Sequence, residues 1–146
     1  MTPIRATDEL VVPFSVAEVW RVLADIAAYP GWWPPSLRLR VLQSKPGILG
    51  SELELRPFGG RPFRCRVDAV EESRSIRTHY YGGFVNGRGE WRLEPSGSGT
   101  RVRYELDVQA DGWLVAGLNL VLPLARIHSR QMKGVLRQLA LKLKRG

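Results

Sequence analysis

The sequence predicts an α+β fold in which a curved antiparallel sheet of about seven strands wraps a long carboxy-terminal helix, with two short helices after the first strand. Apolar and charged residues alternate in short segments between about residues 37 and 110, separated by turn residues, as in a strand meander. Apolar residues then recur at helical spacing up to Leu143. With 146 residues, 44% of them hydrophobic, the chain fits a single domain over residues 1–146.

The first of the two short helices has a well-marked start. The hydroxyl of Ser15 can accept from the amide of Glu18, whose carboxylate can reach back to the amide of Ser15, which forms a capping box. We expect this helix to run from about Val16 to Ala24. Asp25 can cap a second helical piece, which the prolines and glycine within residues 30–35 keep short, so that three large aromatic side chains crowd one turn.

The strand segments have one buried and one wet side. Residues 63–69 and 101–108 alternate apolar with polar or charged side chains, which is typical of a sheet covered on one face. In the segment 85–93, Gly87 and Gly89 lie on the buried side. They either permit a bend in the sheet or leave space that no side chain fills, and both outcomes favour a cavity.

The last segment is strongly amphipathic. Its apolar stripe consists of Val121, Ala125, His128, Met132, Val135, Leu136, Leu139 and Leu143. Another face carries Arg126, Arg130, Lys133 and Arg137, and no acidic residue follows Asp111. Pro123 can stand in the first turn or kink a longer helix that begins near Gly112, and we favour the kink.

The net charge of +8 raises the prospect of an anionic partner such as a peripheral anionic membrane or an acidic carrier protein. The basic face of the last helix is most simply a solvated surface. Arginines also lie on the wet sides of strands, at Arg64, Arg66, Arg88, Arg92, Arg101 and Arg103, so the positive charge is spread and not confined to one groove. A nucleic-acid partner is therefore unlikely, since no familiar binding motif accompanies this charge.

Several classes of protein lose support. The amino terminus does not read as a signal peptide, and Cys65 is the single cysteine, so we expect a cytoplasmic protein without an intrachain disulfide. The longest apolar stretch, Trp113–Ala125, is shorter than the roughly 20 residues of a membrane-spanning helix, so no transmembrane segment is expected. No nucleotide, hydrolase or zinc motif is present, and we predict no cofactor, no metal site and no catalytic residue.

Four aromatic residues are candidates for a ligand site. Tyr80, Trp91 and Tyr104 are in phase with the buried sides of their strands, and Trp33 is placed at the cavity mouth. Their rings would line the cavity with polar tips that orient a ligand. The alternative for Tyr80, Trp91 and Tyr104 is that they fill the core, as such aromatics mostly do. The alternative for Trp33 is a hinge or surface-turn aromatic.

Three residues of the last helix complete the candidate site. His128 lies on the apolar stripe, where a titratable ring could face bound ligand, although a neutral core histidine bonded to the backbone or to a strand side chain is the simpler interpretation. Met132 and Leu136 suit an adaptable apolar wall and would suit any packed helix equally well.

Two stretches of the chain carry a family resemblance. The first is Ala17-Glu18-Val19-Trp20 followed by Asp25 and residues 29–34, and the second is residues 89–95 running into Gly99-Thr100-Arg101-Val102. With the order of elements, they resemble the START-like helix-grip superfamily (SRPBCC), which includes birch-pollen-allergen-like proteins and the polyketide cyclase/dehydrase group. The resemblance implies the helix-grip fold and leaves activity open, because this superfamily hosts carriers, cyclases, hydrolases and interaction modules.

Three functions follow as hypotheses. The first is binding of an apolar or aromatic small molecule, such as a lipid, isoprenoid or polyketide, between the sheet and the last helix. The second is a polyketide cyclase or dehydratase in which His128 or Tyr80 transfers protons and the basic surface docks an acidic carrier protein. The third is a basic interaction module for an anionic membrane, RNA or an acidic protein.

Overall fold

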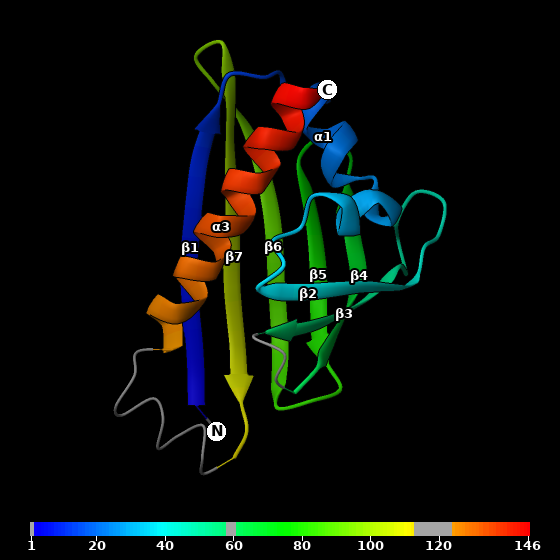
Figure 1. Cartoon of the computed structure of the whole chain (residues 1–146), viewed down its shortest axis with the longest axis vertical. Helices are drawn as coiled ribbons and strands as arrows, with labels where there is room; N and C mark the ends of the chain where they lie inside the picture. Colours follow the sequence, from blue (N-terminus) through cyan, green and yellow to red (C-terminus); the bar gives the residue numbers. More distant parts are fainter. Residues whose placement is uncertain (1, 58–60, 113–123) are drawn as a thin grey trace.

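The computed structural model describes residues 2–57, 61–112 and 124–146 (Figure 1). Its elements, in chain order, are β1 (Thr2–Val12), α1 (Val16–Leu23), the 3-10 helix η1 (Ile26–Gly31), β2 (Leu37–Gln43), β3 (Glu52–Pro57), β4 (Phe63–Glu71), β5 (Ser75–Tyr81), β6 (Val85–Ser96), β7 (Gly99–Ala110) and α3 (Leu124–Arg145). The predicted order of elements is confirmed.

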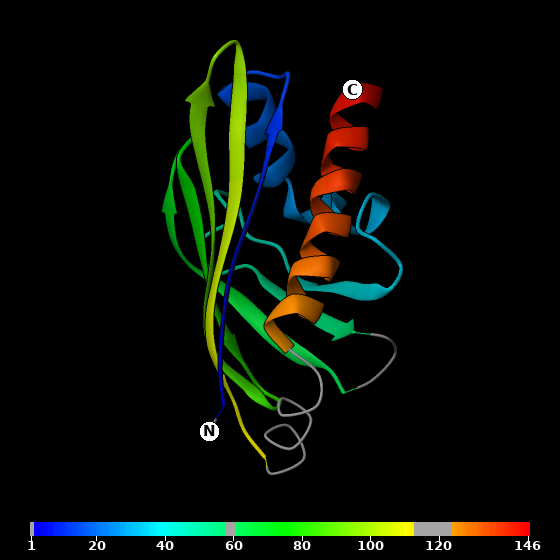
Figure 2. The same cartoon turned by 90° about the vertical axis from the view of Figure 1, so that its left-hand side faces the viewer.

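The seven strands form one sheet in the order β1-β7-β6-β5-β4-β3-β2, and every neighbouring pair is antiparallel. The sheet curls, so that α3 lies along its hollow side and the β2–β3 hairpin closes over that side from the opposite edge (Figures 1 and 2). This is the predicted α+β helix-grip fold.

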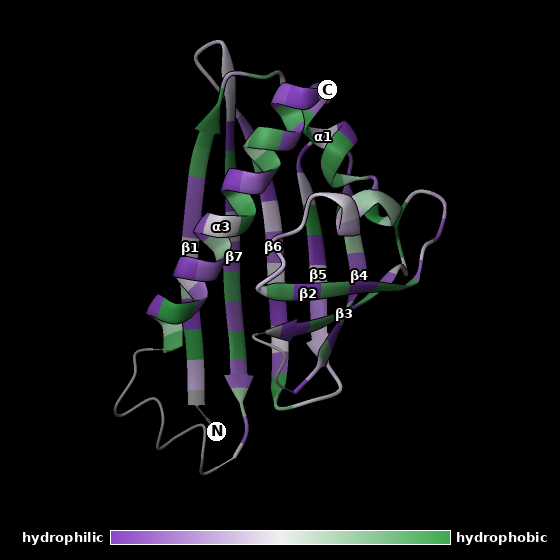
Figure 3. Ribbon diagram, in the orientation of Figure 1, coloured by the Kyte–Doolittle hydropathy of each residue, from purple (hydrophilic) through white to green (hydrophobic). Residues whose placement is uncertain are grey.

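Alternation along each strand decides which face is buried. In β7 every even-numbered residue from Thr100 to Ala110 is buried, while the odd-numbered ones are only partly covered. The same alternation shows as purple and green bands on the strands (Figure 3). The apolar side chains of the inner face then bury against the apolar stripe of α3, where Met132, Val135, Leu136, Leu139 and Leu143 are all buried. Val121 and the expected kink at Pro123 lie outside the described residues.

The short helices follow the prediction in one case and depart from it in the other. The Ser15 amide donates to a Glu18 carboxylate oxygen at 2.8 Å, and the Glu18 amide donates to the Ser15 hydroxyl at 3.2 Å, so the capping box is confirmed. Asp25 holds the N-cap position of η1, but its side chain makes no capping hydrogen bond, so that prediction was wrong. Its backbone carbonyl instead accepts from the Ala28 amide at 3.1 Å.

The two inner-face glycines of β6 serve close packing. At Gly87, whose φ is +147°, a Cβ atom would lie 2.6 Å from the Cα of Val108, so the neighbouring backbone approaches too closely for a side chain. At Gly89 a Cβ atom would lie 2.8 Å from Cζ of Tyr104 and 3.1 Å from the hydroxyl of Tyr80. The space expected beside Gly89 is therefore filled by two tyrosine side chains.

Candidate functional site

An internal cavity of about 60 Å³ lies between the hollow face of the sheet and α3. Of the predicted site residues, the structure brings Trp33, Tyr80, Trp91, Tyr104, His128 and Met132 together around it. Leu136 is buried in the core, but it is not among the lining residues. The sequence did not single out the other lining residues, which are Ile26, Tyr29, Leu37, Leu53, Leu55, Phe63, Cys65, Val67, Ile76, Thr78 and Gln131.

The size of this cavity is informative. A cavity of roughly 150 Å³ holds benzene, and one water molecule takes up about 30 Å³ in the liquid. The 60 Å³ observed here is therefore too little for a lipid or polyketide. A ligand of that size would need the walls of the cavity to move apart.

A pair of tyrosines forms the polar part of the lining. The hydroxyls of Tyr80 and Tyr104 are hydrogen-bonded to each other, and Thr78 beside them donates to the backbone carbonyl of Gly89 at 3.1 Å. The Trp91 and Tyr104 rings meet edge to face, with centroids 4.9 Å apart. The bond between the two hydroxyls uses one of their two hydrogens, so the other is available to a neighbouring acceptor or to a bound molecule.

His128 projects from α3 beside Tyr104, and their ring centroids are 6.1 Å apart. Its Nδ1 atom is buried and has no hydrogen-bond partner among the described residues. Burial lowers the pKa of His128 from 6.5 to about 4, because charging the ring there would cost solvation. The ring is thus neutral at pH 7 and has an unused polar atom, which a ligand could satisfy.

The buried histidine predicts a pH dependence of stability. Because the folded-state pKa of about 4 lies below the unfolded value of 6.5, the unfolded chain takes up more protons between these two pH values. Stability is therefore lost as the pH falls from about 6.5 to 4, by up to about 3 kcal/mol. Urea unfolding of the wild type and of His128→Phe at pH 7 and pH 4.5 measures this loss. We expect the variant to lose distinctly less, and equal losses would contradict the prediction.

The lining as a whole carries no charge at neutral pH. Burial raises the pKa of the Cys65 thiol to about 12 and raises the pKa of Tyr80 and of Tyr104, so these groups remain protonated. No Asp, Glu, Lys or Arg is among the described lining residues. Within the described ranges, no three His, Cys, Asp or Glu side chains gather to hold a metal ion. The cavity suits the uncharged, apolar or aromatic part of a molecule.

Trp33 stands at the boundary of the cavity. Its ring stacks on Tyr29, with centroids 5.6 Å apart and planes 10° apart, and the Tyr29 hydroxyl donates to the carbonyl of Leu23 at 2.5 Å. Trp33 lines the internal cavity and also an outer hollow of about 610 Å³. Trp33 is thus a residue that the linings of the cavity and of the outer hollow share.

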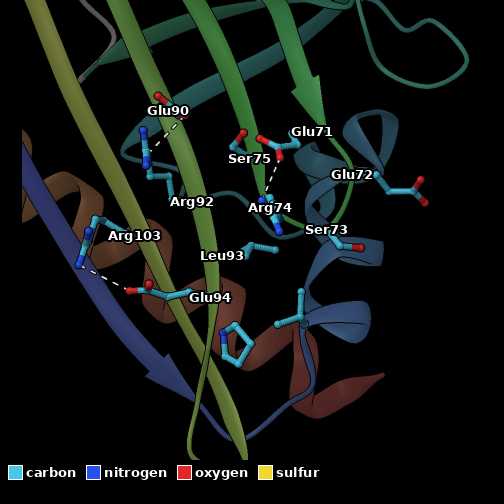
Figure 4. A pocket seen from close by; sticks show the side chains of 12 residues that line it. Glu71, Glu72, Ser73, Arg74, Ser75, Glu90, Arg92, Leu93, Glu94 and Arg103 are labelled. Carbon is cyan, nitrogen blue, oxygen red and sulfur yellow. Dashed lines mark hydrogen bonds and ion pairs between the residues drawn. The ribbon is translucent and has the colours of Figure 1, made fainter.

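A second surface hollow, of about 640 Å³, lies where the β4–β5 turn meets β6 and the start of α1 (Figure 4). Apart from Glu72, its charged side chains pair with one another: Arg74 with Glu71 at 3.2 Å, Arg92 with Glu90 at 3.4 Å and Arg103 with Glu94 at 3.7 Å. Because these charges are already neutralised, this hollow is a weaker candidate than the cavity.

Ion pairs cover much of the outer face of the sheet and change the picture of the basic charge. Arg64, Arg92, Arg101 and Arg103 all pair with glutamates there. Helix α3 holds seven of the 22 basic residues and no acidic residue. The rest of the chain has 15 basic and 14 acidic residues. Helix α3 thus supplies +7 of the net +8, while exposed strand arginines without a described ion pair, such as Arg66 and Arg88, add local positive charge on the sheet. No helix in the described residues is long and apolar enough to cross a membrane.

Comparison with known proteins agrees with this architecture. The ribosome association toxin RatA of Escherichia coli K12 is 24% identical over 106 residues, which cover 71% of this chain and 67% of RatA. A START superfamily protein from Mycobacterium smegmatis superposes with a TM-score of 0.73 at 18% identity, covering 97% of both chains. The di-domain ARO/CYC StfQ of the steffimycin pathway gives a TM-score of 0.75 at 15% identity, covering 99% of this chain and 52% of StfQ.

A family model supplies the assignment. Residues 3–145, nearly the whole chain, match the model described as "Polyketide cyclase / dehydrase and lipid transport", and the solved structures share the fold of this chain. The chain therefore belongs to the polyketide cyclase/dehydrase and lipid transport family.

Proposed function

We propose that the protein binds an apolar or aromatic small molecule, such as a lipid, isoprenoid or polyketide, between its sheet and α3. The observation that carries this proposal is the central cavity, whose described lining is aromatic, aliphatic and uncharged. Family membership supports a hydrophobic ligand-binding fold. A core that served stability alone would gain from filling this space.

Binding would draw its free energy mainly from apolar burial, at about 25 cal/mol per Å² of apolar surface. The Tyr80–Tyr104 pair and the unbonded Nδ1 of His128 would fix the orientation of the ligand through hydrogen bonds. Trp33 would move to admit the ligand, since it lines both the cavity and the outer hollow.

The proposal is tested by native mass spectrometry of the purified protein, with solvent extraction of whatever co-purifies. A thermal-shift screen of fatty acids, isoprenoid alcohols and aromatic polyketides accompanies it. A ligand at 100 times its Kd stabilises the folded state by about 2.7 kcal/mol, which raises the melting temperature measurably. If nothing co-purifies and no compound stabilises the protein, the proposal fails.

The cyclase or dehydratase hypothesis rests on the same residues. A neutral imidazole with a free Nδ1 beside two phenols could accept or pass a proton in a bound polyketide. With such a substrate, His128→Ala should abolish turnover but keep most of the binding, which comes mainly from apolar burial. Unchanged turnover would remove His128 from the reaction.

The charge on α3 supports a second binding function, docking onto an anionic lipid surface. Arg126, Arg130, Lys133 and Arg137 are exposed, spaced to form one stripe, and without ion pairs in the described part of the chain. Each basic residue close to an anionic membrane contributes about 1 kcal/mol. An acidic carrier protein would also be complementary to this positive charge. We favour the membrane because a straight row of charges without aromatic residues matches a flat surface well.

Vesicle flotation tests this docking. The wild type should float with vesicles of phosphatidylserine and phosphatidylcholine, less so in high salt, and not with phosphatidylcholine alone. Replacing the four stripe residues by Glu should abolish flotation. The matched control changes four exposed residues elsewhere, Arg21, Lys45, Arg61 and Arg88, to Glu and should keep most of it. If both variants lost flotation equally, net charge alone would explain the binding, and docking through the basic stripe of α3 would be contradicted.

A further inference from the structure

The outer hollow beyond Trp33 differs in character from the cavity. It is about ten times larger, and the turn after η1 and the outer side of the β2–β3 hairpin enclose it. Its walls are Pro30, Trp33, Pro34, Pro35, Arg38, Leu39, Arg40, Glu54 and Arg56. One side is thus formed by prolines and an indole ring, and the other carries three arginines and one glutamate.

Two of these arginines face each other. Arg38 of β2 and Arg56 of β3 are direct cross-strand partners, and both are exposed. Like charges in this position repel and destabilise a sheet. Neither makes an ion pair with a described residue, and the Glu54 carboxylate in the same lining is paired with Arg40 at 3.4 Å and Arg64 at 3.8 Å.

Two adjacent guanidinium groups without a counter-charge match one ligand chemistry well. Guanidinium donors are arranged to bind the oxygens of a carboxylate or phosphate, often in pairs. An anion between Arg38 and Arg56 would also remove their mutual repulsion. The hollow therefore fits a small anionic group at the side of Trp33 that faces away from the cavity.

We propose that the ligand is an amphiphile, whose anionic group binds Arg38 and Arg56 while its apolar part passes Trp33 into the cavity. This inference rests on the proposed function, because it specifies the class of ligand for the same site. The uncharged cavity lining excludes the ionised end, which stays outside. The small cavity volume is consistent with a ligand that extends into the outer hollow.

Calorimetric titration at low ionic strength with octan-1-ol, octanoate and octyl phosphate tests the inference, since these probes share one apolar chain. The wild type should bind at least one of the anionic probes about tenfold or more tightly than the alcohol. The tighter of the two anions distinguishes a carboxylate ligand from a phosphate. In the double variant Arg38→Gln/Arg56→Gln, the anionic probe should lose about tenfold in affinity, and octan-1-ol should bind as before.

The control is Arg21→Gln/Arg88→Gln, which removes two exposed arginines of α1 and β6 and should leave all affinities unchanged. The inference is overturned if both double variants lose the same affinity for the anionic probe, or if the wild type does not prefer an anionic probe to octan-1-ol. Either result leaves the proposed function standing. Absence of binding by all three probes to the wild type overturns the inference, whereas the proposed function is decided separately by the extraction and the screen. The double variant should melt at or above the wild-type temperature, because a repulsive pair is lost.

Discussion

We expect Gly89→Ala to lower the free energy of unfolding by about 3 kcal/mol. An added Cβ atom would lie 2.8 Å from Cζ of Tyr104 and 3.1 Å from the hydroxyl of Tyr80. Overpacking of this kind costs about 1–3 kcal/mol, and a disturbed buried hydrogen bond adds about 1–3 kcal/mol. Urea unfolding followed by circular dichroism measures the change.

The matched control is Gly134→Ala on α3, where nothing lies within 4 Å of the added atom. This variant should be more stable than the wild type by about 0.5–1 kcal/mol, since alanine favours a helix over glycine. Combining Gly89→Ala with Tyr104→Phe should recover part of the loss, because the hydroxyl closest to the new atom is gone. If Gly89→Ala were as stable as the wild type, the close packing described here would be wrong.

Leu139→Ala should cost about 2–5 kcal/mol, the usual range for a buried leucine. Leu139 lies in α3 and has no exposed surface, so its loss leaves a hole between the helix and its neighbours. Leu141, two residues on, is 42% exposed and serves as the control. Leu141→Ala should change the stability by no more than about 0.5 kcal/mol. Similar losses of stability in both variants would mean that α3 does not pack against the rest of the protein through the face that carries Leu139.

Much of the fold could be predicted because its signals are local. The reciprocal bonds of Ser15 and Glu18 depend on residues three apart, and strand alternation depends on residues two apart. The side-chain cap of η1 was mispredicted because this signal, too, is only local. A residue type that favours a helix start does not reveal whether its side chain or its backbone will accept the hydrogen bond.

The site could be predicted only in part, because its geometry depends on strand register. The close approach of Tyr104 to Gly89 brings together residues of neighbouring strands, and Cys65 reaches the cavity as the cross-strand partner of Tyr80. Helical periodicity places His128 and Met132 on the inner stripe but leaves open how the helix is rotated over the sheet. Gln131 lines the cavity, whereas Leu136, one turn beyond Met132 and equally buried, does not.

The distribution of charge shows the same limit. The arginines on the wet sides of the strands predict positive charge that is spread over the surface, but the sequence does not show which of them are paired. Arg103 pairs with Glu9 at 3.1 Å across 94 residues of sequence, and only the register of β1 against β7 creates that contact.

The central claim, that the cavity between the sheet and α3 holds an apolar ligand, is tested most directly by filling the cavity. Cys65 lines it and is the single cysteine, and Cys65→Leu puts a larger apolar side chain into its 60 Å³. We predict that a molecule that co-purifies with or stabilises the wild type binds this variant at least tenfold more weakly by calorimetric titration, while the variant stays folded. Equal affinity for the folded variant and the wild type would place the ligand elsewhere and contradict the account.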